Sequence, residues 1–274
     1  NAIGGVDVFR NKTKTRNLSY MARARYDFLN KYQVVGTVRR DGSSVNAADF
    51  KWTTNPAIGL SWKAHNEEFI QNLEKIQELK LRVTYGSLIN SLSTPYTSLF
   101  TAEGQNYVFD GESASGYSPS VVLPNPKLEH ERITTLNIGL DFSIFDRFLS
   151  GSVEYYDQVT SNLLLRRGVP STTGYQFTYF NAGEAKNSGL ELSLTANLIN
   201  NDDFKWSVST IWSNNKNELL SLYNDGDGNA ILEDDAYNYY VGQPTNVLRQ
   251  YQFDGIWQEG DDFANAPQAN PDSA

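Results

Sequence analysis

LELSLTANL, at residues 190–198, alternates between apolar and polar side chains at every position. A helix would scatter its apolar residues around its circumference, whereas an extended strand places them all on one side. The same alternation recurs at 20–28, 79–86 and 135–142. A further strand-like run, at 246–258, fits either a membrane strand or a loop hairpin. The pattern predicts about eight strands, at 16–28, 32–41, 54–64, 78–88, 132–144, 147–160, 186–199 and 203–216.

The connections between these strands alternate in length. Tight turns near 29–31, 146 and 200–203 are separated by long segments. Long loops at one end and tight turns at the other are typical of outer-membrane barrels, whose long loops face the outside of the cell. We therefore predict an all-β fold, an antiparallel transmembrane β-barrel in the bacterial outer membrane. Residues 1–274 form part of one barrel domain, and the segments expected to be mainly extracellular loops are 88–131, 161–185 and 217–274.

One connection on the tight-turn side is longer than a turn. Residues 66–77 are predicted to form a short periplasmic helix that covers the rim of the barrel. Asn66 is suited to cap it, and the two glutamates that follow favour the positive end of its dipole. Phe69, Leu73 and Ile76 are spaced to share one apolar stripe.

Composition restricts the class of protein. Mean hydropathy is -0.49 and no stretch approaches the roughly 18 apolar residues of a membrane helix, but barrel strands show only alternate residues to lipid. Tyr, Phe and Trp make up 13% of the chain, and Tyr and Trp favour membrane interfaces. The net charge of -9 argues against nucleic acid as a partner. Because an open sheet leaves two unpaired edges in lipid, we expect further strands outside this chain.

Nothing in the sequence predicts an enzyme or a cofactor. The chain has no cysteine and two histidines, His65 and His130, which are far apart. It carries no phosphate-binding loop, dinucleotide fingerprint or nucleophile elbow. The adjacent acids Glu67-Glu68 and Asp234-Asp235 are better explained as solvated charges than as a glycosidase pair, because no apolar pocket is predicted around them.

The segment NDGDGN at 224–229 is a weak calcium candidate. Asp225, Asp227 and Asn229 fit the first three ligand positions of an EF-hand loop. However, Ala230 stands where that loop requires Gly, and Ala236 stands where it requires a bidentate Glu. A plain turn is therefore favoured, and no metal site is predicted.

Charged residues alternate with apolar ones along several strands. If the apolar face meets lipid, these charges face the lumen. They form either a polar path or plug-docking surface, or an ordinary hydrated interior in which charges satisfy one another, and the second is favoured for any single residue. The predicted lumen-facing residues are Arg23, Arg25, Lys80, Arg82, Asp141, Glu154 and Glu191.

The long loops are rich in aromatic residues. An apolar ring with a polar tip suits both sugars and peptides, although packing within the loop is the commoner role of any one ring. The predicted substrate-contact candidates are Tyr96, Tyr107, Phe109, Tyr117, Tyr175, Phe177, Tyr179, Tyr237, Tyr239 and Tyr240.

Six motifs follow one another in a fixed order along the chain. They are RDGSS at 40–44; GLSW at 59–62 with EEF at 67–69 and LKLRVTYG at 79–86; LPNPKLEHE at 123–131; YY at 155–156 with Thr160 and LL at 163–164; NAG at 181–183 with NSGLE at 187–191; and Trp206 with NNKN at 214–217. In this order and spacing they resemble the SusC/RagA family of TonB-linked outer-membrane proteins. One position departs from the family, since His130 stands where Trp is usual.

This resemblance implies a barrel of about 22 strands with a plugged lumen. It also implies TonB-dependent import of a glycan or an oligopeptide, with the substrate captured under a SusD-like surface lipoprotein. TonB would act through an N-terminal region that precedes this chain, and the barrel wall would contact outer-membrane lipid. Two alternatives stay open: a passive porin or structural barrel without TonB coupling, and a secreted carbohydrate-binding β-sandwich.

Overall fold

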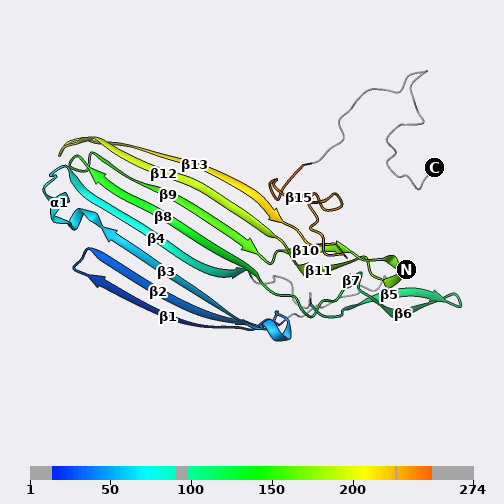
Figure 1. The fold of residues 1–274 in the computed structure, drawn as a ribbon. Coiled ribbons are helices and arrows are strands. Elements are labelled where there is room, and N and C mark those ends of the chain that lie inside the picture. The colour runs from blue at the N-terminus through cyan, green and yellow to red at the C-terminus, as the bar shows by residue number, and fades with distance from the viewer. Residues whose placement is uncertain (1–13, 91–97, 226, 249–274) are drawn as a thin grey trace, which may run out of the picture.

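A computed structural model describes residues 14–90, 98–225 and 227–248. Its main feature is one antiparallel sheet of eight strands in the order β1-β2-β3-β4-β8-β9-β12-β13 (Figure 1). All eight predicted strands are present, and consecutive ones are neighbours. Of the open run 246–258, residues 246–248 form no strand and the rest lies outside the described residues. The strands are β1 Asn17–Phe28, β2 Tyr32–Ser43, β3 Trp52–Lys63, β4 Ile76–Asn90, β8 Glu131–Ile144, β9 Leu149–Ser161, β12 Glu184–Asn200 and β13 Lys205–Ser221.

The long loops contain small elements that the sequence did not predict. They lie at the end of the sheet opposite the tight turns (Figure 1). In sheet order, β10, β11 and β7 form a three-stranded sheet, whereas β5 with β6 and β14 with β15 form separate hairpins. The strands are β5 Ala102–Phe109, β6 Glu112–Pro119, β7 Val122–Leu123, β10 Leu164–Gly168, β11 Phe177–Asn181, β14 Glu233–Asp234 and β15 Tyr239–Tyr240.

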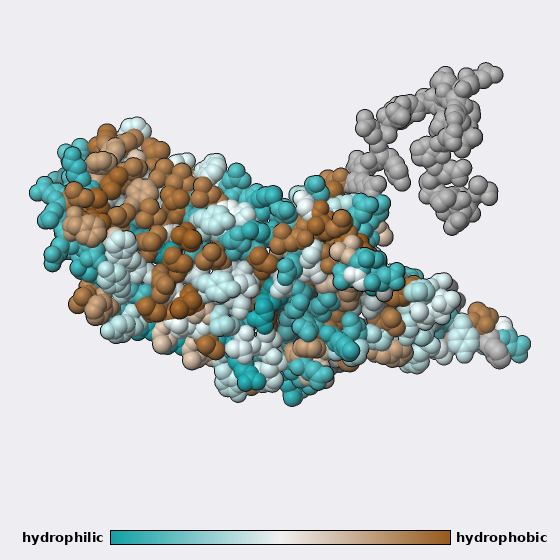
Figure 2. Space-filling model, viewed as in Figure 1, coloured by the Kyte–Doolittle hydropathy of each residue, from teal (hydrophilic) through white to brown (hydrophobic). Residues whose placement is uncertain are grey.

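The large sheet is a single layer. Opposite residues of an antiparallel pair share a face, so Ile138, Tyr155 and Leu190 form one row across β8, β9 and β12. These side chains remain 38%, 42% and 40% exposed, and in the described part of the chain no second sheet or helix covers them. Figure 2 shows hydrophobic side chains gathered over the sheet beside a hydrophilic rim at the tight turns. The β-sandwich alternative is therefore wrong, because a sandwich buries this face.

The densest packing lies among the loops. Leu165, Ala185, Leu219 and Leu222 form a buried apolar cluster where β10 meets the ends of β12 and β13. Leu219 is only 1% exposed, in contrast to the exposed apolar face of the sheet. Because burial of apolar side chains stabilises a fold, this cluster gives the loop region a core of its own.

The tight turns follow from backbone geometry. Leu29 and Asn30 both have φ of 53°, and Lys31 N donates to Phe28 O at 2.9 Å. Two consecutive positive φ values match the twist of a two-residue hairpin. Phe145, Asp146 and Arg147 also have positive φ and join β8 to β9. No helix in the described residues is long and apolar enough to cross a membrane.

The prediction of a helix over 66–77 is wrong in extent. The α-helical part of this segment is α1, Glu68–Gln71, which is a single turn. The other helical turns of the described residues are 3₁₀ helices: η1 Ala48–Phe50, η2 Ala64–Asn66 and η3 Ser171–Thr173. The side-chain amide of Asn66 donates to the carbonyl of Asn30 at 2.7 Å, so it does not cap α1. From Ile76 onward the chain pairs with β8, and these ladder hydrogen bonds override the local helical pattern.

The predicted apolar stripe of that segment is also wrong. Phe69 and Leu73 are 65% and 53% exposed, and Ile70 is the residue of α1 that is buried. The segment is held by the Glu67 carboxylate, which accepts hydrogen bonds from three groups of the neighbouring strands and turn. The donors are Lys31 Nζ at 2.8 Å, Tyr32 Oη at 2.6 Å and Trp62 Nε1 at 3.2 Å. These bonds, Lys31 first, lower the pKa of Glu67 to about 2.

Candidate functional site: the polar face and the loop aromatics

The seven charged residues predicted to face the lumen share one face of the sheet. Lys80 lies opposite Asp141, and Glu154 lies opposite Glu191. Arg82 joins this set because its partner Gly139 is in turn opposite Glu154. The same row runs from Arg82 through Ser61 and Gln33 to Asp27 of β1. Since strand side chains alternate, Arg23 and Arg25 lie on that face too.

Arg82 is the centre of a charge network on this face. Its Nε and Nη2 atoms lie 2.8 Å from the two oxygens of Asp141, and Nη2 also lies 2.6 Å from Glu154. Lys80 Nζ is 3.4 Å from Asp141. A Cβ atom at Gly139 would lie 2.9 Å from Arg82 Nη2, so glycine lets the guanidinium cross β8. The charges of this network therefore satisfy one another, which fits the hydrated-interior interpretation.

The three remaining predicted charges behave differently from the network. Arg25 pairs with Asp27 of its own strand at 2.8 Å. Arg23 and Glu191 form no ion pair with any described residue. Glu191 lies opposite the carboxylate of Glu154, so this part of the face carries excess negative charge.

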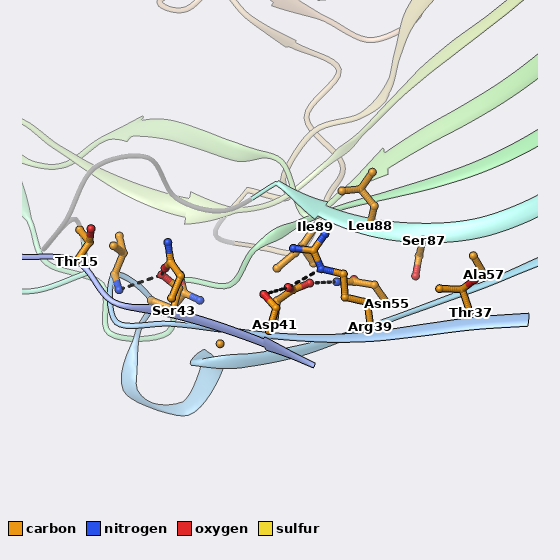
Figure 3. Close-up of a pocket in the computed structure, with 15 residues that line it drawn as sticks. Thr15, Thr37, Arg39, Asp41, Ser43, Asn55, Ala57, Ser87, Leu88 and Ile89 are labelled. Atoms are coloured by element: carbon orange, nitrogen blue, oxygen red, sulfur yellow. Dashed lines mark hydrogen bonds and ion pairs between the residues drawn. The ribbon is translucent and has the colours of Figure 1, made fainter. Parts of the chain in front are cut away.

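A recess of about 570 Å³, lined by both polar and apolar residues, opens on the same face near the long loops. In Figure 3, Arg39 and Asp41 of β2 and Asn55 of β3 point to the same side, with Leu88 and Ile89 of β4 completing the lining. The sequence analysis missed this recess. Its one signal was the RDGSS motif at 40–44, which includes Asp41 but not the residues of other strands.

Asp41 organises the recess. Its carboxylate accepts hydrogen bonds from Ser19 Oγ at 2.6 Å, Arg39 Nε at 2.7 Å and Asn55 Nδ2 at 3.1 Å. Asn46 and Asn55 are 7% and 8% exposed, and the Oδ1 atom of each has no donor among the described residues. Buried acceptors without donors favour a ligand or water that brings N–H or O–H groups.

The predicted aromatic candidates separate into two places. Tyr107 and Tyr117 lie on opposite faces of the β5–β6 hairpin and are 53% and 85% exposed. The others that can be placed lie around β11 and β15, apart from Tyr175, which is half-buried in the turn before β11. Tyr96 lies outside the described residues, as does the side chain of Phe109.

Two ring pairs form within the second group. Phe177 and Tyr179 of β11 meet edge to face, with ring centroids 5.5 Å apart. Tyr237 and Tyr239 stack with centroids 6.1 Å apart, and Tyr240 Oη donates to Asp235 at 2.8 Å. Edge-to-face and offset geometries are the favourable ones for aromatic rings, so both pairs stabilise the loops that carry them.

The calcium candidate is a turn. The carboxylate of Asp225 accepts hydrogen bonds from the backbone N–H groups of Asp227 and Asn229 at 2.9 and 2.8 Å. It also accepts one from the side chain of Asn229 at 2.9 Å. Such Asx turns use the oxygens that a metal would need. Within the described ranges no group of three His, Asp or Glu side chains is arranged to hold a metal ion.

The fold and its two faces define the class of protein. The chain matches the family described as TonB dependent receptor-like, beta-barrel over residues 1–271, and it belongs to that family. It is thus part of an outer-membrane β-barrel of receptors and transporters. The predicted all-β membrane fold is confirmed.

Relatives place the chain in the SusC/RagA-like branch of this family. It is 34% identical over 249 residues to TonB-dependent receptor P39 of Formosa agariphila, covering 91% of this chain and 23% of the relative. TonB-dependent receptor SusC of Bacteroides thetaiotaomicron is 32% identical over 228 residues, covering 80% and 22%. The chain spans about a quarter of the length of these relatives.

Solved structures agree. The RagAB peptide importer in its closed-closed state shares 28% identity with a TM-score of 0.72, over 83% of this chain and 25% of that chain. The siderophore receptor PirA of Pseudomonas aeruginosa, at 15% identity and a TM-score of 0.50, shares the fold alone. The SusC/RagA resemblance predicted from the motifs is confirmed.

Proposed function

We propose that the complete protein imports glycans or oligopeptides across the outer membrane with energy supplied by TonB. This chain contributes about eight strands of the barrel wall and several extracellular loops. A SusD-like lipoprotein covers the substrate on the cell surface, and TonB acts through a region N-terminal to the present chain.

The observation that carries the proposal is the single-layer sheet with one exposed apolar face and one charged face. Such a sheet is stable where lipid covers the first face and water the second. The tight turns and the 66–77 segment then lie in the periplasm, and the loops at 88–131, 161–185 and 217–248 lie outside the cell. The seven predicted charged residues face the lumen, where Arg82 and its acidic partners are in contact with water.

Oligopeptides are the first substrate class to test, because the RagAB neighbour is described as a peptide importer. The aromatic loops and the acceptor-rich recess around Asp41 also suit peptide N–H groups, and they suit sugar hydroxyls equally. The loop aromatics and the recess are therefore suited to oligopeptides and to oligosaccharides alike.

The test is uptake by the bacterium with the complete gene deleted and then restored. Labelled oligopeptides and oligosaccharides serve as probes, and growth on free amino acids and monosaccharides is the control. We expect oligomer uptake to require both the gene and TonB. Uptake that persists without TonB would instead support the passive porin, and uptake that is unchanged by deletion of the gene would refute both.

A further inference from the structure

One arginine of the long loops lies among the predicted substrate-contact aromatics. Arg166 of β10 is opposite Tyr179 of β11. Its guanidinium carbon lies 4.9 Å from the ring centre of Phe177 and 5.5 Å from that of Tyr179. Arg166 Nε also donates to Tyr179 Oη at 3.2 Å. Two rings and one hydrogen bond therefore hold the guanidinium in place, which lowers the entropy lost on binding a ligand.

Arg166 is exposed, and no carboxylate of the described residues lies within ion-pair distance of its guanidinium. On the sheet, Arg39 and Arg82 each bind a carboxylate at 2.8 Å or less. The chain has a net charge of -9, so an immobilised arginine that pairs with no acid of the described ranges is the arrangement expected of an anion site.

The β14–β15 hairpin lies near this cation. Burial raises the pKa of Tyr239, the charge of Asp234 raises it further, and the charge of Arg166 opposes them. Asp234 itself is already bonded, since its carboxylate accepts from Tyr223 Oη at 2.5 Å and from Ala236 N at 3.1 Å. The carboxylate of Asp234 is therefore bonded to Tyr223 and to the turn of its own hairpin, and it forms no ion pair with Arg166.

The neighbouring Arg167 provides the internal comparison. It points to the opposite face of β10, where its guanidinium carbon lies 5.3 Å from the ring centre of Tyr223. Tyr223 packs on the buried apolar cluster around Leu165 and Leu219. Arg167 thus covers the loop core, whereas Arg166 extends from the other face with its rings beside it.

We propose that Arg166, Phe177 and Tyr179 form a subsite that binds a carboxylate group of the imported oligomer. The inference rests on the proposed import function and specifies its substrate as anionic. A guanidinium can donate two parallel N–H bonds to a carboxylate, and the adjacent rings can pack against the residue or sugar that carries it. The carboxylate can belong to a peptide or to an acidic sugar, and the geometry recognises the group common to both.

The test measures binding of labelled probes to the purified full-length protein, and this binding does not require TonB. One pair of probes is a labelled hexapeptide with a free C-terminal carboxylate and the same peptide amidated. The other pair is an oligogalacturonate and its methyl ester. We expect at least one acidic probe to bind about tenfold or more tightly than its neutral counterpart. Arg166→Gln should abolish this preference, and Arg166→Lys should keep part of it.

Arg167→Gln is the matched control, because it removes the same charge from the opposite face of the same strand and should keep the preference. The proposal is overturned if the unmodified protein shows no preference, if Arg166→Gln retains it, or if Arg167→Gln loses it to the same extent. Uptake measurements distinguish the two proposals. If the purified protein prefers acidic probes but the bacterium shows no TonB-dependent uptake, only the import proposal is refuted. If TonB-dependent uptake occurs but the purified protein shows no preference for acidic probes, only the subsite proposal is refuted.

Discussion

Leu192→Arg tests the assignment of the two faces most directly. Leu192 lies in β12 between Val153 of β9 and Trp212 of β13, on the face that carries Leu190 and Leu194. At about 3.3 Å per residue and a tilt of about 40°, the apolar run at 190–198 spans roughly 22 Å across the membrane. That height is close to the apolar band of about 25 Å in such barrels, so Leu194 lies near its middle and Leu192 lies about 5 Å from that middle, still well inside the band.

An arginine near the middle of the band should destabilise the barrel by about 2–4 kcal/mol. Ser193→Arg is the matched control, because it adds the same side chain one residue away on the polar face, where we expect a change below about 1 kcal/mol. Leu190→Arg tests the effect of depth. Leu190 lies on the same face about 10 Å from the middle of the run, so this substitution should lower the free energy of unfolding by only about 0–1 kcal/mol. The assay is a denaturant titration of the full-length protein folded in lipid vesicles. Equal losses for Leu192→Arg and Ser193→Arg would refute the facing argued above.

Two further predictions concern single contacts. Gly139→Val should displace Arg82 from the carboxylates that it binds and destabilise the barrel by about 1–3 kcal/mol in the same titration. Gly36→Val is the control: a Cβ atom at Gly36 meets nothing within 4 Å, so this variant should change stability by less than about 0.5 kcal/mol. Glu67 stabilises the folded state fully above its ordinary pKa of 4.5, and this contribution is lost as the pH falls toward the folded-state pKa of about 2. Glu67→Gln should therefore flatten the dependence of the unfolding midpoint on pH in that acid range; an unchanged slope would show that the bonds from Lys31 and its neighbours contribute nothing.

The helix between β3 and β4 shows where local patterns mislead. Asn66 followed by two glutamates is a good helix start on local grounds. In the folded chain Asn66 and Glu67 instead bind Asn30 and Lys31 of the preceding turn, and only one helical turn forms. Contacts between segments some 36 residues apart overrode a preference worth about 1 kcal/mol.

The candidate sites divide in the same way. The alternation alone predicted that Lys80, Arg82 and Asp141 share a face, and the register agrees. It predicted neither the bonds of Arg82 across Gly139 nor the recess at Asp41, because these depend on which residues of separate strands become opposite.

The amino-acid sequence by itself determined the strands, their two faces and the membrane class, because side-chain direction in a strand follows from a backbone period of two that each residue obeys locally. Tertiary structure alone decided which loop residues meet. Arg166, Phe177 and Tyr179 come together because β10 and β11 pair in one register, and irregular loops have no period from which that register can be read.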